Sequence, residues 1–122
     1  MSAAGIMRLI RGCGPLLQAA PAGRAVFVTT ARTQAPKAYW GTYGATKAAL
    51  DHLALTWADE VATSALRVNL FDPGKMATRL RRGAFPGEDQ STLPQPADVA
   101  PALAALCLPT ETRNGALIRA NP

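Results

Sequence analysis

Tyr43 and Lys47 stand four residues apart at the head of an alanine-rich stretch that is predicted to be helical over residues 42–62. On an α-helix, residues four apart lie on the same face, so the phenol and the ammonium share one small space. A phenol has a pKa near ~10, and a cation held close favours its charged form, so the pair is able to transfer a proton near neutral pH. By spacing alone, a surface helix with a solvated lysine is the alternative interpretation.

Two apolar segments flank this helix and are predicted to be buried strands. Residues 25–30 form a short β-branched run that ends in hydroxyl side chains, the last of them Thr30. Residues 66–71 form the second run, which is followed by Asp-Pro-Gly at residues 72–74 and then by Thr78. Short apolar runs of this composition are typical of strands inside a sheet. The predicted order is therefore strand, helix, strand.

In this order and spacing the residues resemble the short-chain dehydrogenase/reductase family. That family has a Tyr-x-x-x-Lys pair thirteen residues after a catalytic serine, and a following strand that ends in Pro-Gly-x-x-x-Thr. The resemblance implies that Tyr43 and Lys47 are the catalytic pair and that Thr30 stands in the place of the serine. Thr30 keeps the hydroxyl of that serine and adds a methyl group.

The resemblance also implies a reaction, which is hydride transfer between NAD or NADP and a carbonyl or alcohol carbon of a small-molecule substrate. Tyr43 would act as the general acid or base, Lys47 would assist it and hold the cofactor ribose, and Thr30 would orient the substrate oxygen. Which of the two nucleotides is used cannot be read from these residues. The implied cofactor-binding residues are Tyr43, Lys47, Pro73, Gly74 and Thr78.

The fold implied by the resemblance is α/β, a partial Rossmann-like unit with a three-stranded parallel sheet and about three flanking helices. A single domain would fill residues 1–122, with a catalytic core at about 23–74, a substrate loop at about 75–95, and a C-terminal helix and strand at about 96–120. The first strand would lie at an unpaired edge of the sheet.

The glycine-rich turn with which the family binds the cofactor pyrophosphate has no counterpart in this sequence. The resemblance covers about residues 7–120 and corresponds to the C-terminal half of a family member, so the chain is expected to be truncated. This leaves a second hypothesis open: a non-catalytic fragment or pseudoenzyme that serves as a dimerisation or interaction module and binds no cofactor on its own.

The two ends of the chain carry further helix patterns. The apolar residues between positions 7 and 17 have roughly helical spacing, although Gly12 and the Gly14-Pro15 pair predict a helix that starts late or bends. An acid-free start of this kind could alternatively be a mitochondrial transit peptide. Residues 96–108 predict a helix capped by Gln95 or Asp98, with Pro101 in its first turn, and residues 115–119 predict a closing strand parallel to the second one.

The helix at 42–62 is apolar over a broad face, and the resemblance implies that it forms a homodimer interface. Its alanine content is alternatively explained by helix propensity alone. Tyr39 and Trp40, in the loop before it, would either line a substrate pocket or anchor the loop on the core.

Global composition narrows the function classes. The net charge of +5 permits contact with anions, but the basic residues are scattered and the cluster Arg79, Arg81 and Arg82 is predicted to be a solvated face, so nucleic-acid binding is not expected. His52 has no neighbouring ligand cluster, which argues against a metal site. No apolar run reaches the ~18 to 20 residues that span a bilayer. Cys13 and Cys107 are predicted to be reduced thiols of a cytoplasmic protein.

Overall fold

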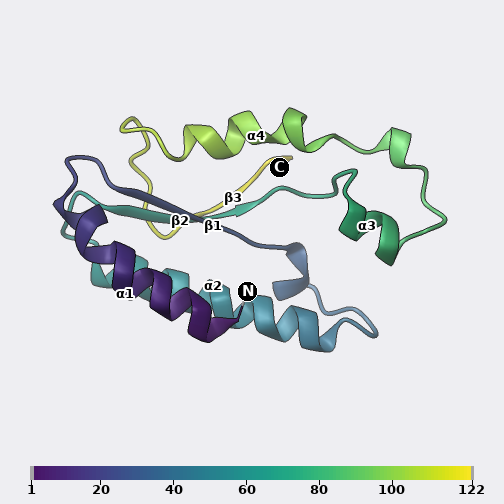
Figure 1. Cartoon of the computed structure of the whole chain (residues 1–122), viewed down its shortest axis with the longest axis horizontal. Coiled ribbons are helices and arrows are strands. Elements are labelled where there is room, and N and C mark those ends of the chain that lie inside the picture. Colours follow the sequence, from purple (N-terminus) through teal and green to yellow (C-terminus); the bar gives the residue numbers. More distant parts are fainter. Residues whose placement is uncertain (1, 122) are drawn as a thin grey trace.

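The computed structural model describes residues 2–121 and places three parallel strands between two layers of helices (Figure 1). Helices α1 (Ala3–Ala19) and α2 (Gly41–Glu60) cover one face of the sheet, and α4 (Pro96–Ala105) covers the other. The α/β class and the three-stranded parallel sheet are confirmed. The described residues contain four helices rather than about three, because α3 (Arg79–Ala84) forms in the segment predicted as a loop.

The sheet has the order β1-β2-β3, with strands at Arg24–Val28, Arg67–Asp72 and Leu117–Arg119. Val28 of β1 pairs with Phe71 of β2, and Asp72 of β2 pairs with Arg119 of β3. Since all pairs are parallel, the carboxyl ends of the three strands lie at the same edge of the sheet. Strand β2 is central and almost entirely buried, and β1 is an edge strand, as predicted.

Alternate residues of β1 pack into two separate hydrophobic clusters, because successive side chains of a strand point to opposite faces. Ala25 and Phe27 pack on the α1–α2 side, against a cluster that includes Trp57 and Val68. Val26 packs on the α4 side, against a cluster of Phe71, Val99 and Leu106. The helices α1 and α2 are thus held on one face by the same strand that leads to the candidate site.

The sequence predicted a first helix that starts late or bends, and the late start is wrong. Ser2 caps the helix, because its hydroxyl accepts a 3.1 Å hydrogen bond from the backbone N–H of Gly5. The helix then continues through Gly12 to Ala19 with Pro15 inside it. The capping bond satisfies a first-turn donor, and Ile6, Ile10 and Leu17 contribute buried or partly buried apolar surface that favours the helix over the whole span.

The prediction for Pro101 is also wrong. Helix α4 has Gln95 as its N-cap and Pro96 in its first turn, which places Pro101 in the helix interior. The carboxylate of Asp98 accepts a 2.9 Å hydrogen bond from the backbone N–H of Gln95, so the helix begins earlier than a cap at Asp98 would allow. The predicted closing strand is confirmed as β3, parallel to β2.

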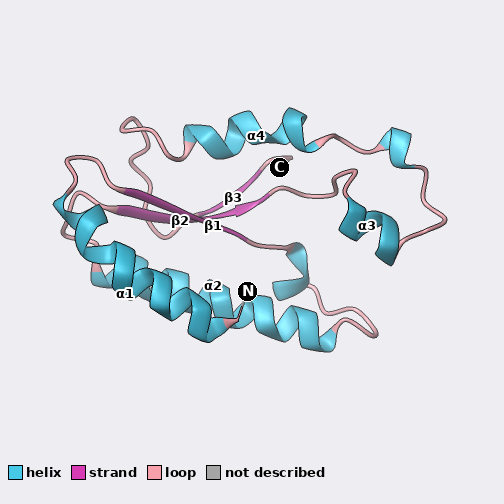
Figure 2. Cartoon of the chain, viewed as in Figure 1, coloured by secondary structure: helices cyan, strands magenta, loops and turns pink. Residues whose placement is uncertain are grey.

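Two connections lie beyond the carboxyl ends of β1 and β2, and short helical turns interrupt both (Figure 2). The first contains a 3₁₀ turn at Ala31–Thr33, and the second contains α3 and a 3₁₀ turn at Gln90–Thr92. Across residues 2–121, no helix combines the length and the apolar character that a membrane crossing needs. The same residues contain no group of three or more metal-ligating side chains.

Candidate active site

Thr30 lies immediately beyond β1 and caps the 3₁₀ turn at Ala31–Thr33. Its side-chain oxygen accepts a 3.4 Å hydrogen bond from the backbone N–H of Arg32, and its carbonyl accepts bonds from Thr33. Because the Thr30 hydroxyl is the acceptor in the first bond, its own hydrogen is available for donation to another group. Thr30 is half-buried, so a small molecule at the end of β1 is able to reach its hydroxyl.

Tyr43 lies in the first turn of α2 and packs against the residue that precedes the helix. The ring of Trp40 meets the ring of Tyr43 edge to face, with centroids 5.4 Å apart and an interplanar angle of 79°. This is a favourable aromatic geometry that fixes the direction of the phenol ring. Tyr43 keeps 37% of its surface exposed, so the ring remains accessible to a substrate.

Lys47 lies one turn after Tyr43 and reaches the end of β1, where its Nζ donates a 3.4 Å hydrogen bond to the carbonyl of Val28. An ammonium group has three donors, so this contact leaves two of them for other partners. Lys47 also lines a cavity of about 310 Å³ between α1, β1 and α2, together with Asp51 and apolar residues that include Leu50.

The end of β2 is held by a small polar network. The buried carboxylate of Asp72 accepts a 2.9 Å hydrogen bond from the backbone N–H of Gly74, and it lies 3.9 Å from Nε of Arg119. Arg119 in turn donates a 2.9 Å bond to Gln34, beyond β1. Gly74 has φ of 73°, a left-handed conformation that favours glycine. The predicted Pro73-Gly74 turn is therefore fixed at the same edge as Thr30.

Thr78 caps α3, because its hydroxyl oxygen accepts a 3.1 Å hydrogen bond from the backbone N–H of Arg81. Arg81 is not part of a solvated face, contrary to the prediction, whereas Arg79 and Arg82 are exposed. The guanidinium of Arg81 donates two hydrogen bonds, from Nε and Nη2, to the two carboxylate oxygens of Glu88, each at 2.8 Å. This hydrogen bonding lowers the pKa of Glu88 and raises the pKa of Arg81. This ion pair links α3 to the loop residues that follow it.

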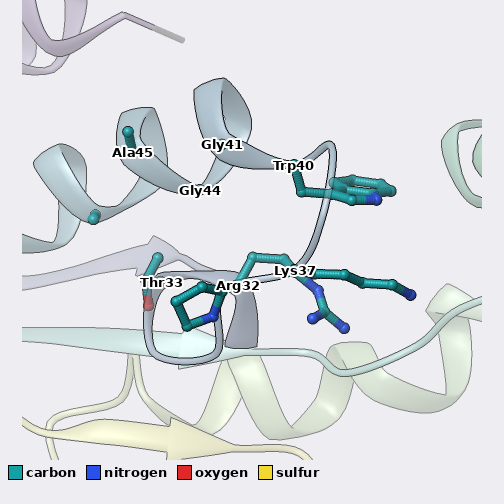
Figure 3. Close-up of a pocket in the computed structure, with 9 residues that line it drawn as sticks. Arg32, Thr33, Lys37, Trp40, Gly41, Gly44 and Ala45 are labelled. Carbon is teal, nitrogen blue, oxygen red and sulfur yellow. The ribbon is translucent and has the colours of Figure 1, made fainter.

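A second cavity, of about 240 Å³, lies between the loop after β1 and the first turns of α2. Gly41 and Gly44 contribute no side chains to it, which leaves it open. Arg32, Lys37 and Trp40 extend from the loop in one direction along its rim (Figure 3). Of the two aromatic residues considered from sequence, Trp40 borders a cavity, whereas Tyr39 is fully exposed, with φ of 71°.

The elements that carry the predicted site residues meet at one end of the molecule, where β1 and β2 end and where α2 and α3 begin (Figure 1). Side-chain contacts join Lys47 to β1 directly and join Tyr43 to the end of α3 through Trp40 and Phe85. The arrangement offers a hydroxyl, a phenol and an ammonium at a half-open surface, which are groups suited to proton transfer. The set comprises Thr30, Tyr43, Lys47, Pro73, Gly74 and Thr78.

Three supporting residues were not singled out from the sequence. Asp51 lies one turn after Lys47 and accepts a 2.8 Å hydrogen bond from the buried Thr29. Phe85 stacks on Trp40, with centroids 6.0 Å apart and an interplanar angle of 12°. The helical spacing of Lys47 and Asp51 was the only local pattern in the sequence that could have pointed to Asp51. Thr29 is distant from Asp51 in the chain, and Phe85 is distant from Trp40, so no local pattern pointed to those two contacts.

Comparison with known sequences identifies relatives for most of this chain. The sequence model described as short chain dehydrogenase matches residues 1–89. The uncharacterized oxidoreductase YciK of Escherichia coli K12 is 40% identical over 87 residues, which are 71% of this chain and 34% of that protein. A benzil reductase ((S)-benzoin forming) of Saccharomyces cerevisiae is 35% identical over 78 residues, 63% of this chain and 30% of its own.

Comparison with solved structures extends the similarity to almost the whole chain. A short chain dehydrogenase from Salmonella enterica serovar Typhi superposes with a TM-score of 0.89 at 33% identity, over 95% of this chain and 48% of the other. A short chain dehydrogenase from Escherichia coli CFT073, complexed with NADPH, gives 0.88 at 34% identity over the same shares. The chain thus spans about half the length of these structures and about a third of the curated relatives.

Proposed function

The chain belongs to the short chain dehydrogenase family, and on that premise we propose that it carries the catalytic residues of an NAD(P)-dependent oxidoreductase. The proposed reaction is hydride transfer between the nicotinamide and a carbonyl or alcohol carbon of a small molecule. The observation that carries the proposal is that Thr30 lies just beyond β1 while Tyr43 and Lys47 lie in the first two turns of α2, with Lys47 hydrogen-bonded to the end of β1.

The donors at this edge suit the nicotinamide half of such a cofactor. Lys47 offers an ammonium with free donors at the end of β1, and the glycine turn after β2 presents backbone without a side chain in the way. We propose that Lys47, Pro73, Gly74 and Thr78 hold that half, together with the phenol of Tyr43. When bound, the nicotinamide supplies or accepts the hydride.

In the direction of reduction, Tyr43 donates the proton of its hydroxyl to the substrate oxygen as that oxygen gains charge. The ammonium of Lys47 stabilises the resulting phenolate, because opposite charges at close range attract strongly in a partly buried site. Thr30 holds the substrate oxygen by donating its free hydroxyl hydrogen. In the reverse direction each proton moves the opposite way, so Tyr43 acts as the base.

The test is cofactor oxidation by the purified 122-residue chain. NADPH and NADH are offered with a panel of carbonyl compounds, starting with benzil, on which the named yeast relative acts. We expect saturable NADPH fluorescence and turnover that Tyr43→Phe lowers by about 100-fold or more while cofactor binding persists. Lys47→Ala should weaken both binding and turnover. Thr30→Ser should retain turnover and Thr30→Val should lose most of it.

Tyr39→Phe is the matched control, because Tyr39 is fully exposed and lies just outside the site. It should leave all rates unchanged. Turnover that survives in Tyr43→Phe contradicts the catalytic assignment. Absence of any cofactor binding by a chain with a native circular dichroism spectrum overturns the proposal as a whole.

A second candidate function is that of a non-catalytic member that serves as an interaction or dimerisation module, which the exposed apolar residues of α1 and α2 support. In either case we propose a cytoplasmic homodimer that uses α2. Leu55 of α2 and Leu9 and Leu16 of α1 are exposed apolar residues that support this interface, and Cys13 and Cys107 are free. Sedimentation of Leu55→Glu beside the unmodified chain tests it: the dimer should dissociate.

A further inference from the structure

Three aromatic rings form a continuous row at the candidate site, which we name the aromatic row: Tyr43, Trp40 and Phe85. Trp40 contacts Tyr43 edge to face and stacks on Phe85 at an interplanar angle of only 12°. The residues come from two segments: Trp40 and Tyr43 from the N-terminal end of α2, where Trp40 is the N-cap, and Phe85 from the C-cap of α3. Phe85 is thus the last ring of a row that starts at the proposed catalytic phenol.

The Trp40–Phe85 contact is a single stacked pair. Its centroid separation of 6.0 Å lies within the ~4.5–7 Å range of aromatic pairs, and one such pair contributes only modestly beyond the area that it buries. Two cations lie against the Phe85 ring, with the guanidinium carbon of Arg81 at 4.0 Å and Nζ of Lys37 at 5.1 Å from its centroid. The Phe85 ring therefore lies on the indole face of Trp40 and is held there by stacking and cation–π contacts. These contacts require only a flat aromatic ring, so the aromatic ring of another molecule is able to make them as well.

The segment that carries Phe85 is weakly attached to the rest of the protein. None of the six residues of α3 is buried, and Leu80 is 76% exposed. The Arg81–Glu88 pair lies within the segment, so it stiffens the segment without fastening it to the sheet. Displacing Phe85 from Trp40 therefore breaks the aromatic stack and the Lys37 contact but no buried packing of α3, and the segment is able to move as a unit.

From this geometry we propose that Trp40 is the substrate-stacking residue of the site and that Phe85 occupies its indole face until a substrate ring replaces it. The substrate class is then planar aromatic carbonyl compounds, whose ring lies on Trp40 while the carbonyl oxygen is near Tyr43. This inference rests on the proposed oxidoreductase function for its kinetic consequences, but the binding step is independent of turnover.

The binding test uses two ketones of similar size, acetophenone and cyclohexyl methyl ketone, which differ in the flat ring. The chain has two tryptophans, so the indole N–H signals in a ¹H–¹⁵N NMR spectrum report on Trp40 and, as an internal control, on the buried Trp57. Titrations are run with and without NADPH. We expect acetophenone to shift the Trp40 signal saturably in at least one condition, while Trp57 and the cyclohexyl titration show no comparable change.

Phe85→Ala distinguishes a ring that competes with the substrate from a ring that forms part of its pocket. Removing a competitor should tighten acetophenone binding by about threefold to tenfold, in line with the strength of one aromatic pair. Weaker binding in Phe85→Ala, equal shifts from both ketones, or no shift of Trp40 in either condition overturns the inference.

The kinetic test compares the same two ketones. Trp40→Leu should raise KM for acetophenone by about tenfold relative to that for cyclohexyl methyl ketone, whereas any loss of kcat through Tyr43, whose ring Trp40 orients, should be shared by both ketones. Trp40→Phe should restore most of the preference, and Tyr39→Leu should not alter it. An unchanged ratio in folded Trp40→Leu contradicts the assignment. Failure of both ketones to oxidise NADPH would count against the proposed function, while the NMR titration still decides the stacking site.

Discussion

The hydroxyl of Thr29 donates a 2.8 Å hydrogen bond to the carboxylate of Asp51, and this bond ties the end of β1 to α2. Thr29 is buried, and its backbone N–H bonds the carbonyl of Phe71 in β2. One residue therefore links the helix that carries Tyr43 and Lys47 to the two strands that end at the site. The bond sits directly before Thr30 in the chain.

Removal of this bond should destabilise the protein measurably. Thr29→Val keeps the shape of the side chain but leaves Asp51 without its donor, and hydrogen bonds to charged groups contribute about 1.5–3 kcal/mol. Thr29→Ser should recover most of the loss. Urea unfolding followed by circular dichroism measures the change. Thr56→Val is the control, because its hydroxyl bonds only the exposed carbonyl of His52. Equal stability of the Thr29 and Thr56 variants would contradict the role assigned to the bond.

Two glycines should respond in opposite directions to alanine. A methyl group on Gly23 would lie 2.1 Å from the carbonyl oxygen of Leu17, where α1 ends against the start of β1. The backbone must shift to relieve this overlap, so Gly23→Ala should cost about 1–3 kcal/mol. Gly12 has open space around the same position, and within a helix Gly→Ala stabilises by up to about 1 kcal/mol.

Thermal unfolding of the two variants side by side measures both effects. A Gly23→Ala protein as stable as the unmodified chain would mean that α1 does not end tightly against β1. A Gly12→Ala protein that loses stability would mean that the exposed side of α1 is occupied in solution.

The Glu111–Arg113 pair predicts a specific dependence of stability on pH. Hydrogen bonds from the side chain and the backbone of Arg113 lower the pKa of Glu111 from 4.5 to about 2. Because the folded-state pKa is below the unfolded value, the contribution is fully present above pH 4.5 and is lost as the pH falls toward 2. The free-energy difference between the unmodified chain and Glu111→Gln should shrink over that window.

The same comparison in an Arg113→Gln background isolates the contribution of the Glu111–Arg113 pair to the pH dependence of stability. Without its partner, Glu111 should contribute much less of this pH dependence. A difference that keeps the same pH profile in both backgrounds would attribute the effect to other groups.

Asn69 should be among the least replaceable residues in β2. Its side chain is buried, donates a 2.9 Å bond to the carbonyl of Arg113, and accepts a 3.0 Å bond from the backbone N–H of Ala116. Asn69→Leu leaves both backbone groups without these partners, at about 1–3 kcal/mol each. Asn121→Leu is the exposed control. If hydrogen exchange shows no faster opening of residues 113–119 in Asn69→Leu, Asn69 does not hold β3 in place.

The sequence by itself determined the order of strands and helices around the Tyr43–Lys47 pair. Hydrophobic periodicity and the positions of turn-forming residues are local properties. The strands at 25–30 and 66–71 and the helix at 42–62 could therefore be predicted from the sequence alone. The Tyr43–Lys47 spacing places both residues on one helix face before any tertiary contact is known. The parallel sheet followed from the family resemblance, and the structure bears it out.

Only the tertiary structure decided which side chains support the site. Thr29 meets Asp51 across 22 positions of sequence, and Trp40 meets Phe85 because the loops after β1 and β2 come together at one sheet edge. Such contacts depend on strand register and loop path, which local sequence does not encode. Arg81 was misjudged for the same reason, because its partner Glu88 lies beyond the end of α3, where no helical spacing applies.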